Sequence, residues 1–208
     1  MKFLVVLLAA GRSARFGGNK LLADFRGRPV VCSALEAMRA LDACDAVRAV
    51  VTGDARIAAL AAQYGCGVIE NTEPERGQSH SIHLAVSRAM AMGADALLFL
   101  AADQPLLTGE SLKRLVVGFE TGGGGIACLR DDTHEGNPAV FAARYYPELL
   151  EIAGDRGAKG ILRAHREDVL TIACAAGNEL ADCDTPEALA ALEGGGPSEG
   201  WWKESPAG

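Results

Sequence analysis

The sequence predicts an α/β fold with a mostly parallel sheet and helices on both of its faces. Apolar runs of strand length alternate with segments of helical spacing over the first 120 residues. This alternation is typical of parallel strands joined by crossover helices. The chain has 208 residues, of which 49% are hydrophobic, and this is enough for one sizeable core. We therefore expect one domain over residues 1–193 and a flexible tail over residues 194–208, where periodicity is lost.

Composition excludes several classes of partner. The formal net charge is −7, which argues against a nucleic-acid backbone, and no apolar run is long enough to span a membrane. The apolar N-terminal run leads straight into a glycine-rich loop, so we expect no signal peptide. The six cysteines are scattered without a CxxC pair, which favours reduced thiols. The predicted location is the cytoplasm.

The expected elements of the first half follow from local pattern. Strands are predicted where short apolar or β-branched runs end at glycine or polar residues, over residues 3–8, 46–51, 67–69 and 96–100. Helices are predicted where apolar residues recur at helical spacing, over residues 30–41, 56–64 and 79–92. A further helix opens at Thr108 or Ser111, either of which can cap it, and runs to residue 120.

The second half is less regular. A glycine run precedes a strand over residues 126–129, and further strands are expected over residues 137–142 and 169–174. Short helices are expected over residues 145–152 and 158–165, around the sequence GDRGAKG. Thr185 and Pro186 suit the cap and first turn of a last helix over residues 185–192.

The first strand runs into LLAAGRSARFGGNKLL, residues 7–22. Glycines let backbone N–H groups close around an anion, and basic side chains add positive charge; the loop holds both, as Gly11, Arg12, Arg15, Gly17, Gly18 and Lys20. It is neither a Walker sequence nor GxGxxG. The pattern indicates a triphosphate-binding loop, and the alternative is a surface turn whose basic residues aid solubility.

Two carboxylates are candidates for a metal site. Asp103 directly follows a buried strand, and ligands of open α/β sheets lie at the carboxyl ends of strands. A carboxylate there, near a phosphate loop, suits Mg²⁺, although it is equally suited to cap a helix before Pro105. Asp184, in ADCDTPEAL, is the second candidate and Asp182 its neighbour. The alternative for Asp184 is a helix N-terminus.

The segment Gly77-Gln78-Ser79 opens a helix, and small or hydroxylated residues there can approach a nucleoside closely. Glu70 and Asn71 leave the preceding strand and are candidates for the same pocket; an ordinary turn capped by Ser79 is the alternative. His80 and His83 share a helix face. They lack an HExxH motif or a cysteine pair, so a solvated or substrate-facing pair is favoured over a metal site.

The loop LAAGRSARFGGNKLL resembles the signature LAAGxSxRxGxxK of the MobA-like nucleotidyltransferases, and within them it is most similar to the molybdenum cofactor cytidylyltransferases. Guanylyl-transferring relatives usually carry LAGG here, whereas this chain has Ala9 and Ala10 before Gly11. The resemblance covers the chain to about Leu192. It implies a three-layer α/β/α Rossmann-like nucleotide-diphospho-sugar transferase fold.

The resemblance also implies roles for the motifs. Asp103-Gln104-Pro105 matches the DxP element that holds the catalytic metal, and Asp184 matches a late aspartate facing that metal. The Gly77-x-Ser79 opening matches a segment that contacts the nucleoside. The sequences GNP (136–138) and GDRGAK (154–159) match elements on the acceptor side, where Lys159 replaces the arginine common in relatives and loses its bidentate geometry.

The reaction implied is transfer of CMP from CTP to molybdopterin-bound molybdenum cofactor, with release of pyrophosphate and Mg²⁺ as the cofactor. A transient molybdoenzyme or chaperone is a further candidate partner. The resemblance assigns catalytic roles to Arg15, Lys20 and Asp103 and metal binding to Asp103 and Asp184. It assigns the nucleotide to Leu8, Ala9, Ala10, Gly11, Arg12, Lys20, Asn71, Gly77, Gln78 and Ser79. It assigns binding of the acceptor to His134, Asn137, Pro138 and Asp155, and Arg156 is a further hypothesis for this role.

Two alternatives stay open. The same fold can use GTP or another nucleotide with molybdopterin or a phosphorylated sugar or alcohol. A chaperone that binds a nucleotide and hands the cofactor on without catalysis belongs to a different class of protein.

Overall fold

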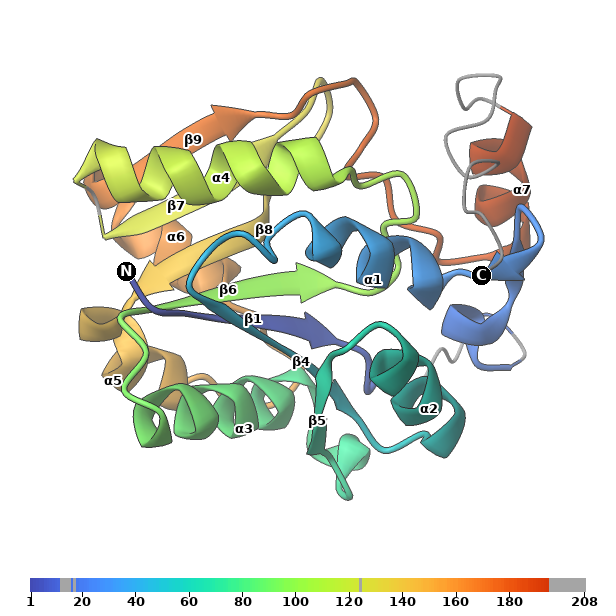
Figure 1. Cartoon of the computed structure of the whole chain (residues 1–208), viewed down its shortest axis with the longest axis horizontal. Helices are drawn as coiled ribbons and strands as arrows, with labels where there is room; N and C mark the ends of the chain where they lie inside the picture. The colour runs from blue at the N-terminus through green and yellow to red at the C-terminus, as the bar shows by residue number, and fades with distance from the viewer. Residues whose placement is uncertain (12–15, 17, 124, 195–208) are drawn as a thin grey trace.

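A seven-stranded sheet forms the centre of the protein, as a computed structural model that describes residues 1–11, 16, 18–123 and 125–194 shows (Figure 1). The strand order is β5-β4-β1-β6-β8-β7-β9. All neighbours are parallel except β8, which is antiparallel to both β6 and β7. The strands are β1 (Phe3–Leu8), β4 (Ala46–Thr52), β5 (Gly67–Glu70), β6 (Ala96–Ala101), β7 (Ile126–Arg130), β8 (Glu135–Ala142) and β9 (Val169–Ala173).

Helices cover both faces of this sheet because its central strands are apolar on both sides. Along β1, Val5 and Leu7 belong to one core, whereas Leu4 and Val6 belong to the other. The first core is closed by α1 (Val31–Arg39), α2 (Ala55–Gln63), α4 (Gly109–Gly122) and α7 (Pro186–Gly194). The second is closed by α3 (Gln78–Ala91), α5 (Tyr146–Leu150) and α6 (Lys159–Ala164). The predicted three-layer, mostly parallel architecture is confirmed.

The reversed strand β8 positions the functional end of the molecule. Since β8 runs against β6, with Phe99 opposite Ala139, its first residues lie where the parallel strands end. Gly136 and Asn137 are therefore brought to the same edge as the residues that follow β1 and β6. Loops that are far apart in the sequence meet there (Figure 1).

The predicted strands and helices are all present, and their ends differ from the predicted ones by at most two residues. Thr108 caps α4 through a bond from the Ser111 amide. Pro29 ends a two-residue strand, and α1 begins two residues later, at Val31, without a side-chain cap. That strand, β3 (Arg28–Pro29), pairs with β2 (Asp24–Phe25) in a small hairpin that the sequence did not predict.

The last helix reaches Gly194, one residue into the predicted tail, and residues 195–208, with Trp201 and Trp202, lie outside the described residues. No helix in the described part of the chain combines the length and apolar character needed to cross a bilayer.

Candidate active site

A cavity of about 680 Å³ opens at the carboxyl end of β1 and β6. Its lining includes apolar side chains, among them Leu8, Ile82 and Phe99, and several charged ones. The charged lining residues are Lys20, Asp103, Asp155, Lys159, Asp182 and Asp184. Such a volume is in the range of small-molecule sites, and its position is where open α/β sheets bind ligands.

Lys20 joins the two predicted metal-binding carboxylates. Its Nζ donates to Asp103 Oδ2 at 2.5 Å and to Asp184 Oδ1 at 2.7 Å. Lys20 begins the short 3-10 helix η1 (Lys20–Leu22), Asp103 follows β6, and Asp184 precedes α7. The Lys20 side chain is only 14% exposed. The structure therefore brings three residues, 83 and 164 positions apart in the sequence, to one point.

The electrostatics keep Lys20 charged. Burial alone lowers the pKa of Lys20, but the hydrogen bonds to Asp103 and Asp184 outweigh it and raise the pKa above its usual 10.5. Burial, and then the charge of Asp103, raise the pKa of the neighbouring Asp182. Burial also raises the pKa of the Cys183 thiol to about 11, so this cysteine is a neutral thiol and not a nucleophile.

Two hydrogen bonds join the segments that carry the two carboxylates. The Cys183 amide donates to the Asp103 carbonyl at 2.9 Å. The buried Gln104 donates through Nε2 to the Leu180 carbonyl at 3.1 Å. The end of β6 is thus bonded to the segment before α7, and Asp184 faces Asp103 because of this pairing.

The predicted nucleotide-binding residues divide into two groups. Leu8, Ala10, Gly11, Gly77 and Gln78 line the cavity, together with Lys20. Ala9 does not line the cavity. Successive residues after β1 point to opposite faces of the sheet, and Ala9 packs in the first core, on the face covered by α1. Arg12 and Arg15 lie outside the described residues.

Asn71 and Ser79 are buried and do not line the cavity. Asn71 donates through Nδ2 to Ser81 Oγ at 3.0 Å and accepts from the Glu73 amide. These bonds hold the loop before α3, so Asn71 positions a residue of the cavity lining, Ser81, and does not line the cavity itself. Ser81 lines the cavity instead. Sequence reasoning missed it, although helical spacing places it on the same face as Gln78.

Gly77 holds the start of α3 against the loop 154–157. It has φ +85°, and a Cβ there would lie 2.6 Å from both the Gly154 carbonyl oxygen and Asp155 Oδ1. Only glycine accommodates this backbone and this contact. The Ser79 amide then donates to the Gly154 carbonyl at 3.0 Å. The predicted nucleoside and acceptor elements therefore touch directly.

On the predicted acceptor side, Asn137 and Asp155 line the cavity, and so does Lys159. Pro138 is buried and does not line it. His134 is half-exposed outside the cavity, where its ring contacts Thr133 Oγ1 and Asp131. The prediction for His134 therefore finds no support in this geometry, because the β7–β8 turn directs the side chain to Asp131.

The two histidines of α3 do not form a metal centre. His83 Nε2 lies 2.9 Å from the Ile152 carbonyl, and His80 lies beside Glu73. Among the described residues, no group of three or more His, Cys, Asp and Glu side chains is arranged to hold a metal ion. The carboxylates that converge on Lys20 are those of Asp103 and Asp184.

The fold and the cavity define a nucleotidyltransferase of the Rossmann-like glycosyltransferase type. The chain belongs to the MobA-like NTP transferase domain family, whose model matches residues 5–169. It is 29% identical over 190 residues to purine catabolism protein PucB of Bacillus subtilis, a match that covers 88% of this chain and 91% of PucB. It is 29% identical over 161 residues to a probable molybdenum cofactor guanylyltransferase of Pyrococcus horikoshii, which covers 77% and 78% of the two chains.

Solved structures share this fold. The crystal structure of Rv0371c from Mycobacterium tuberculosis is similar with a TM-score of 0.77 and 25% identity, over 93% of this chain and 98% of that one. The structure of a CMP:2-keto-3-deoxy-manno-octonic acid synthetase complexed with CTP has a TM-score of 0.70 at 16% identity, over 93% and 98% of the chains, and shares the fold.

Proposed function

We propose that this protein transfers CMP from CTP to molybdopterin-bound molybdenum cofactor and releases pyrophosphate. The observation that carries the proposal is the convergence of Lys20, Asp103 and Asp184 in the lining of a cavity that Gly11, at the end of the LAAG sequence, also lines. Support for CTP comes from Ala9 and Ala10 of that loop. Support for the acceptor comes from Asn137, Asp155 and Lys159, which line the same cavity.

The chemistry needs positioning and charge neutralisation rather than a base. A phosphate oxygen of the acceptor forms a bond to the α-phosphorus of CTP. The bond from that phosphorus to the oxygen bridging to the β-phosphate breaks, and pyrophosphate leaves with the electron pair. No residue has to take a proton, because a phosphate monoester is already anionic at neutral pH.

The residues present fit a divalent cation. One oxygen of Asp103 and one of Asp184 lie within 2.7 Å of the same Lys20 nitrogen, so they converge as two ligands of a small cation would. Mg²⁺ is usually held by one or two carboxylates together with substrate phosphates. Asp103 and Asp184 would hold it, and it would neutralise charge on phosphate oxygens. Lys20 would then exchange its carboxylate partners for oxygens of the leaving pyrophosphate.

GTP is the second candidate nucleotide. The observation in its favour is the similarity to the Pyrococcus guanylyltransferase, which spans most of both chains. Against it stands the second alanine of LAAG, where guanylyl-transferring relatives usually have glycine. A larger purine would occupy the same cavity, so the choice rests on the lining near Ala10.

A turnover panel tests the proposal. Pyrophosphate release is measured with CTP, GTP, ATP and UTP in turn, with Mg²⁺ and with or without molybdopterin carrying molybdenum. We expect release with CTP that depends on the acceptor. Release with GTP alone would favour the second candidate. Nucleotide binding without any release would overturn the enzymatic proposal and favour a cofactor chaperone.

A further inference from the structure

The position of Lys20 depends on a turn of only three residues. Such a turn provides little rigidity by itself, because its 3-10 hydrogen bonds are few in number and poor in geometry. Asn19 caps it: its Oδ1 accepts from the Leu21 amide at 3.1 Å, and its carbonyl accepts from the Leu22 amide at 3.0 Å. The Asn19 side chain therefore fixes the direction in which Lys20 leaves the loop.

The nitrogen of the Asn19 side-chain amide bonds to a residue that follows a second strand, β4. Asn19 Nδ2 donates to Asp54 Oδ2 at 3.0 Å. Asp54 lies just after β4, which pairs with β1 in parallel. The aspartate thus stands at the carboxyl edge of the sheet beside the loop that carries Lys20.

Asp54 is itself held on several sides. Its amide donates to Thr52 Oγ1 at 3.1 Å, and its Oδ1 caps α2 by accepting from the Arg56 amide at 2.9 Å. The Arg56 guanidinium approaches Oδ2 at 2.7 Å. The preceding residue, Gly53, leaves no room for a side chain, since a Cβ there would meet the Asn71 carbonyl oxygen at 2.4 Å. This anchor is therefore rigid.

We propose that Asn19 and Asp54 are positioning residues that hold Lys20 in register with Asp103 and Asp184. Neither of them lines the cavity, so they act through Lys20 and not on the substrate. The bridge requires one side chain that accepts from Leu21 and donates to Asp54, which asparagine does and aspartate does not. The expected change in kcat rests on the proposed function. The expected change in protection of the Leu21 amide can be measured whether or not that function is correct.

Exchange of the two side chains gives a sharp test. In Asn19→Asp, two carboxylate oxygens face each other at hydrogen-bond distance and repel. In Asp54→Asn, the new side chain has one oxygen where the aspartate has two. It can accept a hydrogen bond from the Asn19 side chain or from the Arg56 amide, but not from both.

The double variant, Asn19→Asp with Asp54→Asn, restores the bridge with its direction reversed. The carboxylate now at position 19 accepts both from the Leu21 amide and from the side-chain amide at position 54. The side-chain oxygen at position 54 still caps α2 by accepting from the Arg56 amide. Arg56→Ala is the control, because it removes the exposed guanidinium alone.

We expect each single variant to lower kcat for pyrophosphate release by about 10- to 100-fold, since small misplacements of a charged group have effects of this size. The KM for the nucleotide should change by less than about threefold, because the cavity lining is intact. The double variant should recover to within about threefold of the wild-type kcat, and Arg56→Ala should equal the wild type. A double variant no better than the singles, or wild-type kcat in Asn19→Asp, would overturn the proposal.

Amide hydrogen exchange provides the readout that does not depend on activity. In the substrate-free protein, the Leu21 amide should exchange at least about tenfold faster in Asn19→Ala and in Asp54→Ala than in the wild type, whereas amides of β1 should be unchanged. If the wild type releases no pyrophosphate, the proposed function fails while this measurement still decides the bridge. Unchanged protection of Leu21 in both variants would contradict the bridge even in an active enzyme.

Discussion

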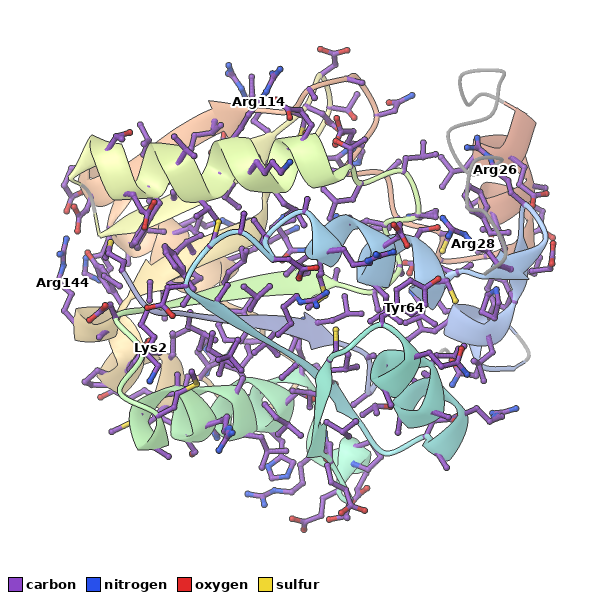
Figure 2. All side chains as sticks on the ribbon, viewed as in Figure 1. Lys2, Arg26, Arg28, Tyr64, Arg114 and Arg144 are labelled. Atoms are coloured by element: carbon purple, nitrogen blue, oxygen red, sulfur yellow. The ribbon has the colours of Figure 1, made fainter. Side chains whose placement is uncertain are left out.

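The two ends of the sheet each hold a cluster of opposite charges, and the clusters differ in which charge is shared. At the carboxyl end, one cation, Lys20, is shared by Asp103 and Asp184. At the amino end, one carboxylate, Asp168, accepts from the Arg144 guanidinium, the Tyr145 hydroxyl and the Gly125 amide. Figure 2 shows Arg144 and Lys2 at this amino end, opposite Arg26 and Arg28.

Exposure separates the clusters further. The Lys20 side chain, which lines the cavity, is 14% exposed, whereas that of Arg144 is 56% exposed on the surface. The first cluster gathers two carboxylates in a partly desolvated place, which suits a divalent cation and phosphates. The second gathers several donors around one acceptor and clamps the start of β9 to the segment after β8. Aspartates thus take part in the proposed reactive site at one end and in a structural clamp at the other.

The largest effect is expected from Lys20→Met. The substitution removes the ammonium group that Asp103 and Asp184 share, so turnover should fall by about 100- to 1,000-fold, as for loss of a central electrostatic group. The measurement is pyrophosphate release with CTP and acceptor.

Lys2→Met is the matched control for this variant. Lys2 Nζ donates to the Met92 carbonyl at the amino end, away from the cavity lining. We expect unchanged turnover, and an equal loss in both variants would contradict the contrast between the two ends.

An intermediate effect is expected from Gly77→Ala. The backbone of Gly77 lies in a region that only glycine adopts readily, which costs about 1–3 kcal/mol for other residues, and its Cβ would press on Gly154 and Asp155. Denaturant unfolding should show that loss of stability, and turnover should fall by about tenfold because two walls of the cavity move apart.

Gly123→Ala separates the backbone effect from the contact. Gly123 has φ +66° but no atom within 4 Å of a Cβ. This variant should lose about 1 kcal/mol with no change in turnover. Unaltered turnover in Gly77→Ala would show that the contact does not shape the site.

The smallest effect on activity is expected from Asp168→Asn. The Tyr145 hydroxyl and then Arg144 lower the pKa of Asp168 to about 2, from an ordinary 3.8. A lowered folded pKa stabilises the protein above pH 3.8, and this contribution is lost as the pH falls through about 2. The variant should lose about 1–2 kcal/mol of stability near neutral pH. Its free energy of unfolding should also depend less steeply on pH in the acid range. Unfolding curves between about pH 2 and 7 measure this, and an unaltered pH dependence would contradict it.

Much of the fold was predictable from local pattern. The strands of the large sheet and the helices that cover it follow from apolar runs and helical spacing, since buried parallel strands carry near-continuous apolar sequence. The hairpin of β2 and β3 was missed because two-residue strands have no period to detect. The antiparallel direction of β8 could not be predicted from its sequence either, because a strand buried on both faces has the same apolar pattern in either direction.

The sequence predicted several of the residues that line the cavity but not their contacts. Lys20, Asp103 and Asp184 were identified by the resemblance, but no motif records their direct ion pairs or the bond from the Cys183 amide to the Asp103 carbonyl beside them. Asn71 was assigned to the pocket because it follows a strand, but its buried amide is used by Ser81 and Glu73. Asn19 was missed, although asparagine before a turn is a common cap.

The most direct test of the central claim measures turnover and unfolding free energy on the pair Asp103→Asn and Asp168→Asn, which make the same chemical change at opposite ends of the sheet. We expect a crossed result, in which Asp103→Asn loses pyrophosphate release while keeping its stability within about 1 kcal/mol, and Asp168→Asn keeps turnover while losing stability. Full turnover in Asp103→Asn, or equal losses of turnover in both variants, would contradict the assignment of the reaction to the carboxyl end.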